Sequence, residues 1–287
     1  MAGQVRMLST IVLGVVAPML VCSAVLIVAW RLRDRGCLIR ATALGLGYLS
    51  CQLIVDGWPA FPPHETWQGL FALVVGAMMI GGIDAVGRRP LILRLIGAAV
   101  LAGTIGWLIV LPNQEHLWVH RTTLAASLVL WLFSMQSITS RSRGASVSLP
   151  LCVALVGVSL VLVLSGNAKL AQLAGGAAAC LGGATLVAWW RAEAGLGCES
   201  IAVAGVLTIG LAYSGYSLSF SGVPVWAYLV AVAAPLAVWV GALPRSRKLG
   251  GWKVVTLTTL ITVLISGIAV VGAFIAWRAD LANDPYF

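Results

Sequence analysis

The chain has 287 residues, of which 60% are hydrophobic and only 9% carry a charge, and its formal net charge is +9. Because soluble domains contain about a quarter charged residues, this composition excludes a water-soluble globular protein. In a soluble protein so positive a charge would suggest nucleic acid as the partner. Here the basic residues lie mainly in short loops between apolar segments, so we expect the lipid bilayer as the partner and no nucleic acid.

Apolar segments close to the ~20 residues that a helix needs to cross a bilayer follow one another along the chain. They lie at approximately 9–30, 38–56, 67–86, 91–111, 118–138, 147–165, 168–190, 199–219, 224–243 and 254–277. The first is too long for a signal-peptide core and no small-residue cleavage site follows it, so we expect a retained span. The sequence predicts an all-α, polytopic membrane bundle of about ten helices, with residues 1–287 in one transmembrane domain and no soluble domain.

The lysines and arginines are concentrated in every second loop. Fourteen of the 18 follow the odd-numbered spans, namely Arg31, Arg33, Arg35, Arg40, Arg88, Arg89, Arg94, Arg141, Arg143, Arg191, Arg245, Arg247, Lys248 and Lys253. Because positively charged loops stay in the cytoplasm, both termini are predicted to be extracytoplasmic, in a cell membrane of the prokaryotic inner-membrane type. Ten of the 12 tryptophans lie near span ends, which fits two membrane interfaces, and only Trp107 and Trp131 lie appreciably inside a span.

The segment 168–190 is rich in glycine and alanine and has no charged or amide side chain after Gln172. Small residues let membrane helices approach closely, so we expect the most enclosed helix of the bundle here. The residues expected at its helix contacts are Ala171, Gly175, Gly176, Ala179, Gly182 and Gly183. Only residues 165–167 separate it from the preceding span, which predicts a tight turn with Asn167 as the N-cap.

Two prolines, Pro18 in the first span and Pro235 in the ninth, predict kinks in otherwise regular helices. Ten spans can also divide into two inverted units of five, as in several secondary transporters. Pro90 and Pro224 precede the fourth and ninth spans, which would correspond in such a repeat, but no other landmark matches convincingly. The repeat therefore stays an open alternative.

Residue types that could carry chemistry gather at the predicted extracytoplasmic ends of the spans. All three histidines, His64, His116 and His120, lie there, and the last two share one helix face because they are four residues apart. Acidic residues of the same region are Asp56, Glu65 and Glu115. Imidazoles with a carboxylate suit a zinc ion, and they also suit general-base catalysis.

Two site hypotheses follow from this grouping. The metal candidates are His64, His116, His120 and Glu65, and the catalytic candidates are His64, His116, His120, Asp56 and Glu115. Both hypotheses require the proline-rich loop from Trp58 to Trp67 to fold over the start of the fifth span. The alternative is a set of ordinary interfacial residues. No cofactor is otherwise implied, and six scattered cysteines predict neither a disulfide framework nor a thiolate metal site.

Lys169 begins the glycine-rich span on the same predicted side. Its side chain can extend to the lipid headgroups, or it can form a salt bridge with Glu115 or Asp56. One turn before Asp56, Gln52 interrupts an apolar run, and a buried amide needs hydrogen-bond partners.

Three classes of function remain open. A non-catalytic scaffold, or a membrane subunit that binds other subunits or further copies of itself, fits the scarcity of charges inside the spans. A secondary transporter or carrier for an apolar or amphipathic solute fits a five-plus-five arrangement, although coupled transport normally uses buried charges. A membrane enzyme would use the extracytoplasmic histidines and carboxylates.

Overall fold

The computed structural model describes residues 2–32, 36–59, 63, 65–85, 91–110, 112, 114–139, 144–243 and 251–283. The long helices are α1 (Ala2–Arg31), α2 (Gly36–Asp56), α3 (Thr66–Ala85), α4 (Leu91–Ile109), α5 (Leu117–Thr139), α6 (Ala145–Leu164), α7 (Ala168–Trp190), α8 (Ile201–Ser217) and α11 (Gly251–Asn283). The shorter pieces are the 3-10 turns η1 (Ala192–Ala194) and η2 (Cys198–Ser200), and α9 (Val225–Ala233), η3 (Ala234–Ala237) and α10 (Val238–Ala242), which together form the ninth predicted span.

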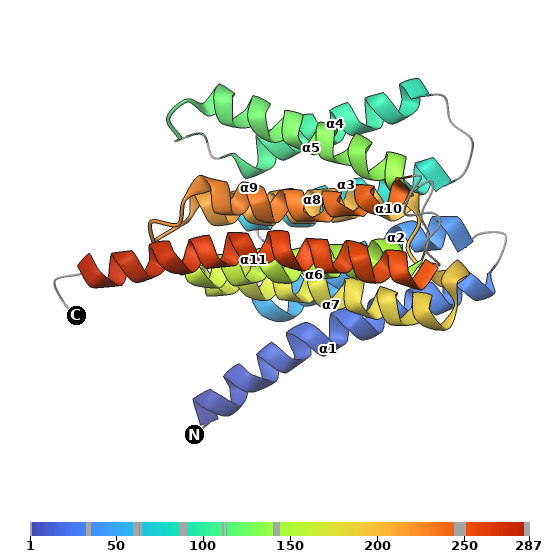
Figure 1. Cartoon of the computed structure of the whole chain (residues 1–287), viewed down its shortest axis with the longest axis horizontal. Coiled ribbons are helices and arrows are strands. Elements are labelled where there is room, and N and C mark those ends of the chain that lie inside the picture. The colour runs from blue at the N-terminus through green and yellow to red at the C-terminus, as the bar shows by residue number, and fades with distance from the viewer. Residues whose placement is uncertain are drawn as a thin grey trace.

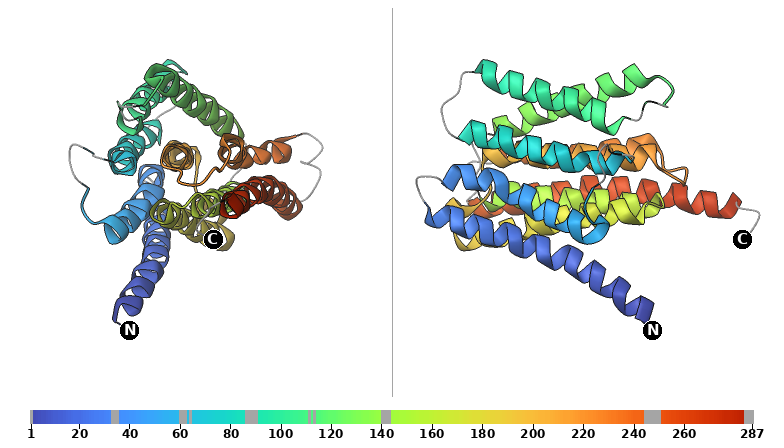
Figure 2. Two further views of the ribbon diagram at one scale, coloured as in Figure 1. Left: turned by 90° about the vertical axis from the view of Figure 1, so that its left-hand side faces the viewer. Right: turned by 180° about the vertical axis from the view of Figure 1, so that it is seen from behind.

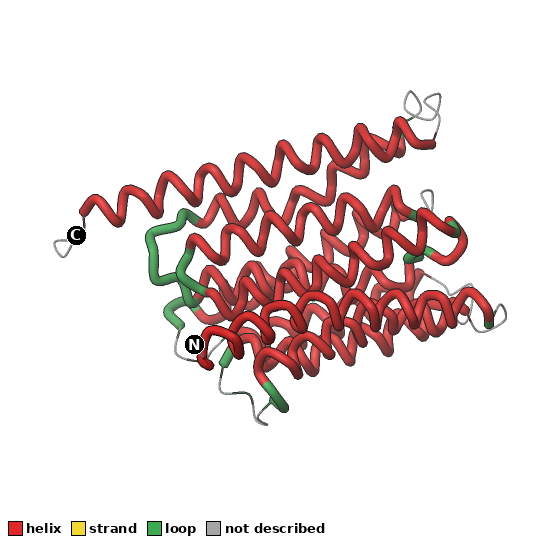
Figure 3. The backbone as a smooth tube through the Cα atoms, turned by 90° about the horizontal axis from the view of Figure 1, so that it is seen from below, coloured by secondary structure: helices red, strands yellow, loops and turns green. Residues whose placement is uncertain are grey.

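These helices lie side by side in one bundle (Figure 1). Within the described residues, nine segments are long and apolar enough to cross a membrane, and the apolar part of α4, Leu93–Ile109, is shorter. The prediction of an all-α, multi-pass membrane bundle is confirmed. The start of α1 and the end of α11 lie at the same end of the bundle, which we call the terminal end (Figures 1 and 2). There α11 continues past its neighbours (Figure 3).

A tight turn joins α6 to α7 at the terminal end. Gly166 has a φ of 83°, a left-handed conformation that glycine adopts without steric cost. Asn167 stands at the N-cap position of α7, but the prediction that its side chain caps this helix was wrong. Its amide instead donates to the carbonyl oxygens of Gly215 (3.4 Å) and Leu218 (3.0 Å), so it ties the turn to the end of α8.

The most enclosed span is α8 with its preceding 3-10 turns, of which 89% is buried, against 72% for α7. The prediction that α7 is the most enclosed span was therefore wrong. The physical reason is that Gly205, Gly210 and Gly215 lie on different sides of α8. A Cβ there would meet Trp131 of α5, Leu70 of α3 and Leu162 of α6, respectively. Neighbours therefore surround α8, which lies in the middle of the bundle when viewed end-on (Figure 2, left).

The glycines of α7 divide into close and loose contacts. A Cβ on Gly183 would lie 2.7 Å from the carbonyl oxygen of Met19 in α1, and one on Gly176 would meet Cys51 of α2. A Cβ on Gly175 would come only within 3.7 Å of Ser159, and one on Gly182 only within 3.8 Å of Cys152. The face of α7 toward α1 and α2 is therefore tightly packed, and the side toward α6 has more room.

The two prolines lie in different surroundings. α1 remains helical through Pro18, and the Cys180 thiol donates to the Pro18 carbonyl at 3.5 Å. At Pro235 the ninth span changes from α to 3-10 geometry. Near that break the indole Nε1 of Trp131 donates to the Val232 carbonyl at 3.2 Å, which satisfies a polar group that lipid could not.

Helix contacts do not follow an inverted repeat. In a five-plus-five repeat, each of the first five spans corresponds to the span five places later, so α1 matches α6, α2 matches α7 and α5 matches α11. Contact of α1 with α7 would then be repeated by contact of α6 with α2, and contact of α6 with α11 by contact of α1 with α5. Among the described residues, α1 packs along α7 and α6 packs along α11, whereas neither corresponding pair makes comparable contact. The two halves of the chain are therefore packed differently.

Candidate ligand-binding site

Three side chains at the terminal end join α2, α3 and α7. Asp56 ends α2 and forms an ion pair with Lys169 in the first turn of α7. The indole Nε1 of Trp67 donates to Asp56 Oδ2 at 2.9 Å, and the ammonium of Lys169 lies 4.6 Å from the centre of the Trp67 ring. Of the two carboxylates considered as partners for Lys169, the structure has Asp56. We call Asp56, Trp67 and Lys169 the terminal cluster.

Burial strengthens this cluster. The Asp56 side chain is 13% exposed and that of Lys169 is 41% exposed, so their attraction is screened less than that of a pair in open water. One turn below, the fully buried Gln52 donates through Nε2 to the Trp67 carbonyl at 3.4 Å. The sequence expectation that this amide needs a partner is met for its nitrogen, while Oε1 has no described partner.

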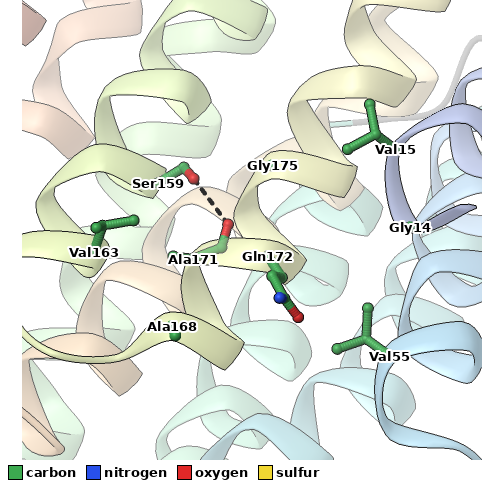
Figure 4. A pocket seen from close by; sticks show the side chains of 9 residues that line it. All are labelled: Gly14, Val15, Val55, Ser159, Val163, Ala168, Ala171, Gln172 and Gly175. Carbon is green, nitrogen blue, oxygen red and sulfur yellow. Dashed lines mark hydrogen bonds between the residues drawn. The ribbon is translucent and has the colours of Figure 1, made fainter. Parts of the chain in front are cut away.

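A cavity of about 320 Å³ lies between the helices near the terminal cluster. Figure 4 shows the residues that line it. Its lining comes from α1, α2, α6 and α7 and consists of Gly14, Val15, Val55, Ser159, Val163, Ala168, Ala171, Gln172 and Gly175. Val55 and Ala168 directly precede Asp56 and Lys169 in the chain, so the ion pair adjoins the cavity. The walls are mainly apolar, which suits a hydrocarbon chain.

Local sequence explains why this space is open. Gly14 and Gly175 lack side chains, and Ala168 and Ala171 have small ones. In addition, the first half of α1 diverges from the rest of the bundle toward the terminal end (Figures 1 and 2). Side chains therefore leave a space between α1, α2, α6 and α7. It lies next to a close contact of α1 with α7, where a Cβ on Gly176 would be 3.1 Å from the Gly14 carbonyl oxygen.

The cavity has few polar groups, and some of them already form hydrogen bonds within the protein. The Ser159 hydroxyl donates to the Ala171 carbonyl at 2.8 Å. Gln172 is half-buried and projects from α7 into the space between the helices (Figure 4), and its amide has no hydrogen-bond partner among the described residues. Pro18 has no N–H to donate to the Gly14 carbonyl four residues earlier. The cavity thus offers the Gln172 amide, as donor and acceptor, within mainly apolar walls.

At the opposite end of the bundle, the connection between α7 and α8 is bound to α2. Arg40 of α2 pairs with the buried Glu199 at 3.5 Å and donates through Nη1 to the Glu193 carbonyl at 2.8 Å. Ser200 Oγ donates to the Arg40 carbonyl at 3.0 Å. Ala194 and Leu196 are also buried, so this connection packs against the ends of α1, α2, α3 and α7.

The predicted histidine site is only partly within the described residues. His116 is exposed with a φ of 58° just before α5, and Glu115 beside it is exposed. The His120 ring packs against Tyr213 of α8, with ring centres 6.1 Å apart. His64 lies outside the described residues, and Glu65 is exposed.

Within the described part, no group of three or more His, Cys, Asp or Glu residues could hold a metal ion. Asp56, one of the catalytic candidates, is engaged by Lys169 and Trp67. The cavity, in contrast, combines mainly apolar walls with an amide that has no described hydrogen-bond partner. The sequence signal for the cavity was Gln172, the last amide before a long uncharged stretch.

Comparisons of the chain with protein-family models, with curated proteins and with solved structures find no match.

Proposed function

We propose that this protein is a multi-pass cell-membrane protein that binds a lipid-like amphipathic molecule in the cavity between α1 and α7. The observation that carries the proposal is the unpartnered Gln172 amide in an otherwise apolar cavity. A polar group in such surroundings is costly unless something hydrogen-bonds to it. A ligand with an apolar chain and a polar head meets both conditions.

Charge and size narrow the ligand class. Asp56 and Lys169 neutralise each other, so the polar region next to the cavity favours an uncharged or zwitterionic head. The volume of about 320 Å³ is at the lower end of the range for small-molecule sites. One alkyl chain with a compact polar head, as in a monoacylglycerol, fits these features.

The orientation in the membrane is part of the proposal. Basic residues in the loops at the opposite end favour a cytoplasmic location for that end, as in a prokaryotic inner membrane. The cavity would then face the extracytoplasmic leaflet. Binding without coupled transport is favoured because the two halves of the chain do not pack as an inverted repeat.

Binding of a monoacylglycerol to the purified protein, measured by native mass spectrometry, tests this function. Gly175→Leu places a side chain where a Cβ has room, 3.7 Å from Ser159, and so fills the cavity without a clash at Cβ. If it displaces about two methylene groups of the ligand, affinity should fall about tenfold. The matched control is Gly267→Leu on α11, where nothing lies within 4 Å of the added Cβ.

Wild type and Gly267→Leu should both carry one monoacylglycerol per chain. Absence of binding to wild type, or equal binding by Gly175→Leu, would contradict the proposal. Gln172→Leu distinguishes the contribution of the polar head from that of the alkyl chain. It should weaken the binding of monoacylglycerol and leave the binding of a simple alkane of the same length unchanged.

A further inference from the structure

A second polar feature lies on the α4–α5 hairpin, on the other side of the bundle from α1 (Figure 2). The guanidinium carbon of Arg121 in α5 lies 4.4 Å from the ring centre of Trp107 and 5.5 Å from that of Trp118. The two tryptophans are 66% and 70% exposed, so their rings form part of the outer surface. We call Arg121, Trp107 and Trp118 the arginine clamp.

The charge in the arginine clamp is not neutralised by the described protein. The ion pairs among the described residues are Asp56–Lys169 and Arg40–Glu199, and neither involves Arg121. Its Nε is buried and has no hydrogen-bond acceptor among the residues that the structure describes. Glu115 is exposed, and it forms no described ion pair with Arg121. A guanidinium has five N–H donors, so an external acceptor has several bonds to gain.

The start of α5 adds donors at the same place. Arg121 is in the second turn of this helix, whose first N–H groups have no acceptor inside the helix. The His116 carbonyl accepts from Val119 and His120 at 2.8 and 3.2 Å, but no described bond takes the N–H groups of Leu117 or Trp118. Helix N-termini favour anions, and arginine matches the oxygen geometry of a phosphate.

We propose that the arginine clamp binds the phosphate group of a phospholipid in the leaflet at the terminal end. The exposed faces of Trp107 and Trp118 lie where a helix surface meets lipid in a membrane bundle, and indoles prefer the headgroup level. The bound anion is therefore a lipid headgroup, and the rings hold the guanidinium at that level. This inference is independent of the cavity function.

Thermal unfolding of the purified chain with added phosphatidylglycerol tests the clamp. Diacylglycerol with the same acyl chains lacks the phosphate, and inorganic phosphate lacks the chains. Phosphatidylglycerol should raise the unfolding temperature of wild type, and neither comparison compound should do so. Arg121→Gln should need about tenfold more phosphatidylglycerol for the same shift, because a charge-assisted hydrogen bond is lost. Arg278→Gln, an exposed arginine at the same end of the bundle, should respond as wild type does.

Arg121→Lys keeps the charge and loses the planar guanidinium, so phosphatidylglycerol should raise its unfolding temperature less than that of wild type. This variant provides the test if Arg121→Gln does not fold. Equal responses of wild type and Arg121→Lys or Arg121→Gln would overturn the clamp. A shift produced equally by diacylglycerol would show that chains alone are bound, and one produced by inorganic phosphate alone would show a free-anion site. Either result would overturn the assignment of a phospholipid headgroup.

Discussion

Replacement of Gly183 by alanine tests the packing of α7 against α1 most sharply. The added Cβ would lie 2.7 Å from the Met19 carbonyl oxygen and 3.0 Å from Met19 Cγ. Carbon atoms in normal contact are about 3.5–4.0 Å from their neighbours, so α1 must shift away by several tenths of an ångström or more. The Ser23 hydroxyl, 2.6 Å from the added Cβ, can rotate aside, but the Met19 carbonyl oxygen is backbone and cannot.

The magnitude follows from two opposing terms. Overpacking of this kind typically costs ~1–3 kcal/mol. Alanine is intrinsically better than glycine in a helix by about 1 kcal/mol, which offsets part of that cost. At Gly103 in α4 nothing lies within 4 Å of an added Cβ, so Gly103→Ala has only the favourable term. The free energies of unfolding of the two variants should therefore differ by ~1–3 kcal/mol.

Buried cysteines provide the assay. Cys22, Cys51 and Cys180 are fully buried and become reactive when the bundle opens, so a maleimide dye that fluoresces on reaction reports thermal unfolding in detergent. Gly183→Ala should unfold at a lower temperature than Gly103→Ala. Equal unfolding temperatures would refute the close contact between α7 and α1.

Two other outcomes follow from the structure. In a double-mutant cycle, Asp56→Asn and Lys169→Gln should show a coupling of about 1 kcal/mol, and a coupling near zero would mean that the ion pair does not stabilise the fold. Cys37 and Cys198 are the exposed cysteines of the described chain and lie at the opposite end of the bundle. A membrane-impermeant maleimide should label them in inverted vesicles but not in intact cells, and labelling in intact cells would reverse the proposed orientation.

Most helix positions could be predicted from the sequence, because the length and hydrophobicity of each apolar segment indicate a membrane span without reference to the rest of the chain. The close approach of α7 to its neighbours was likewise expected, since glycine at positions such as Gly176 and Gly183 has few other uses in a membrane helix. Which side of the helix is tight and which is loose could not be predicted. That distinction depends on the direction in which α1 leaves the bundle.

Interactions between distant residues were harder to predict. The Asp56–Lys169 pair was one of two alternatives, because only the shared end of the bundle could be inferred from the topology. The Arg40–Glu199 pair was missed, since Arg40 was interpreted as an orientation signal. A count of basic residues in the loops cannot show that the connection before α8 folds back into the bundle.

Electron cryomicroscopy of the protein in a lipid bilayer shows directly whether the cavity holds a ligand. We expect elongated density in the cavity between α1 and α7, lined by Val15, Val55 and Val163, with its polar end within hydrogen-bond distance of the Gln172 amide. A structure in which α1 closes against α7 and the Gln172 amide bonds to protein would contradict a ligand-binding role for this cavity.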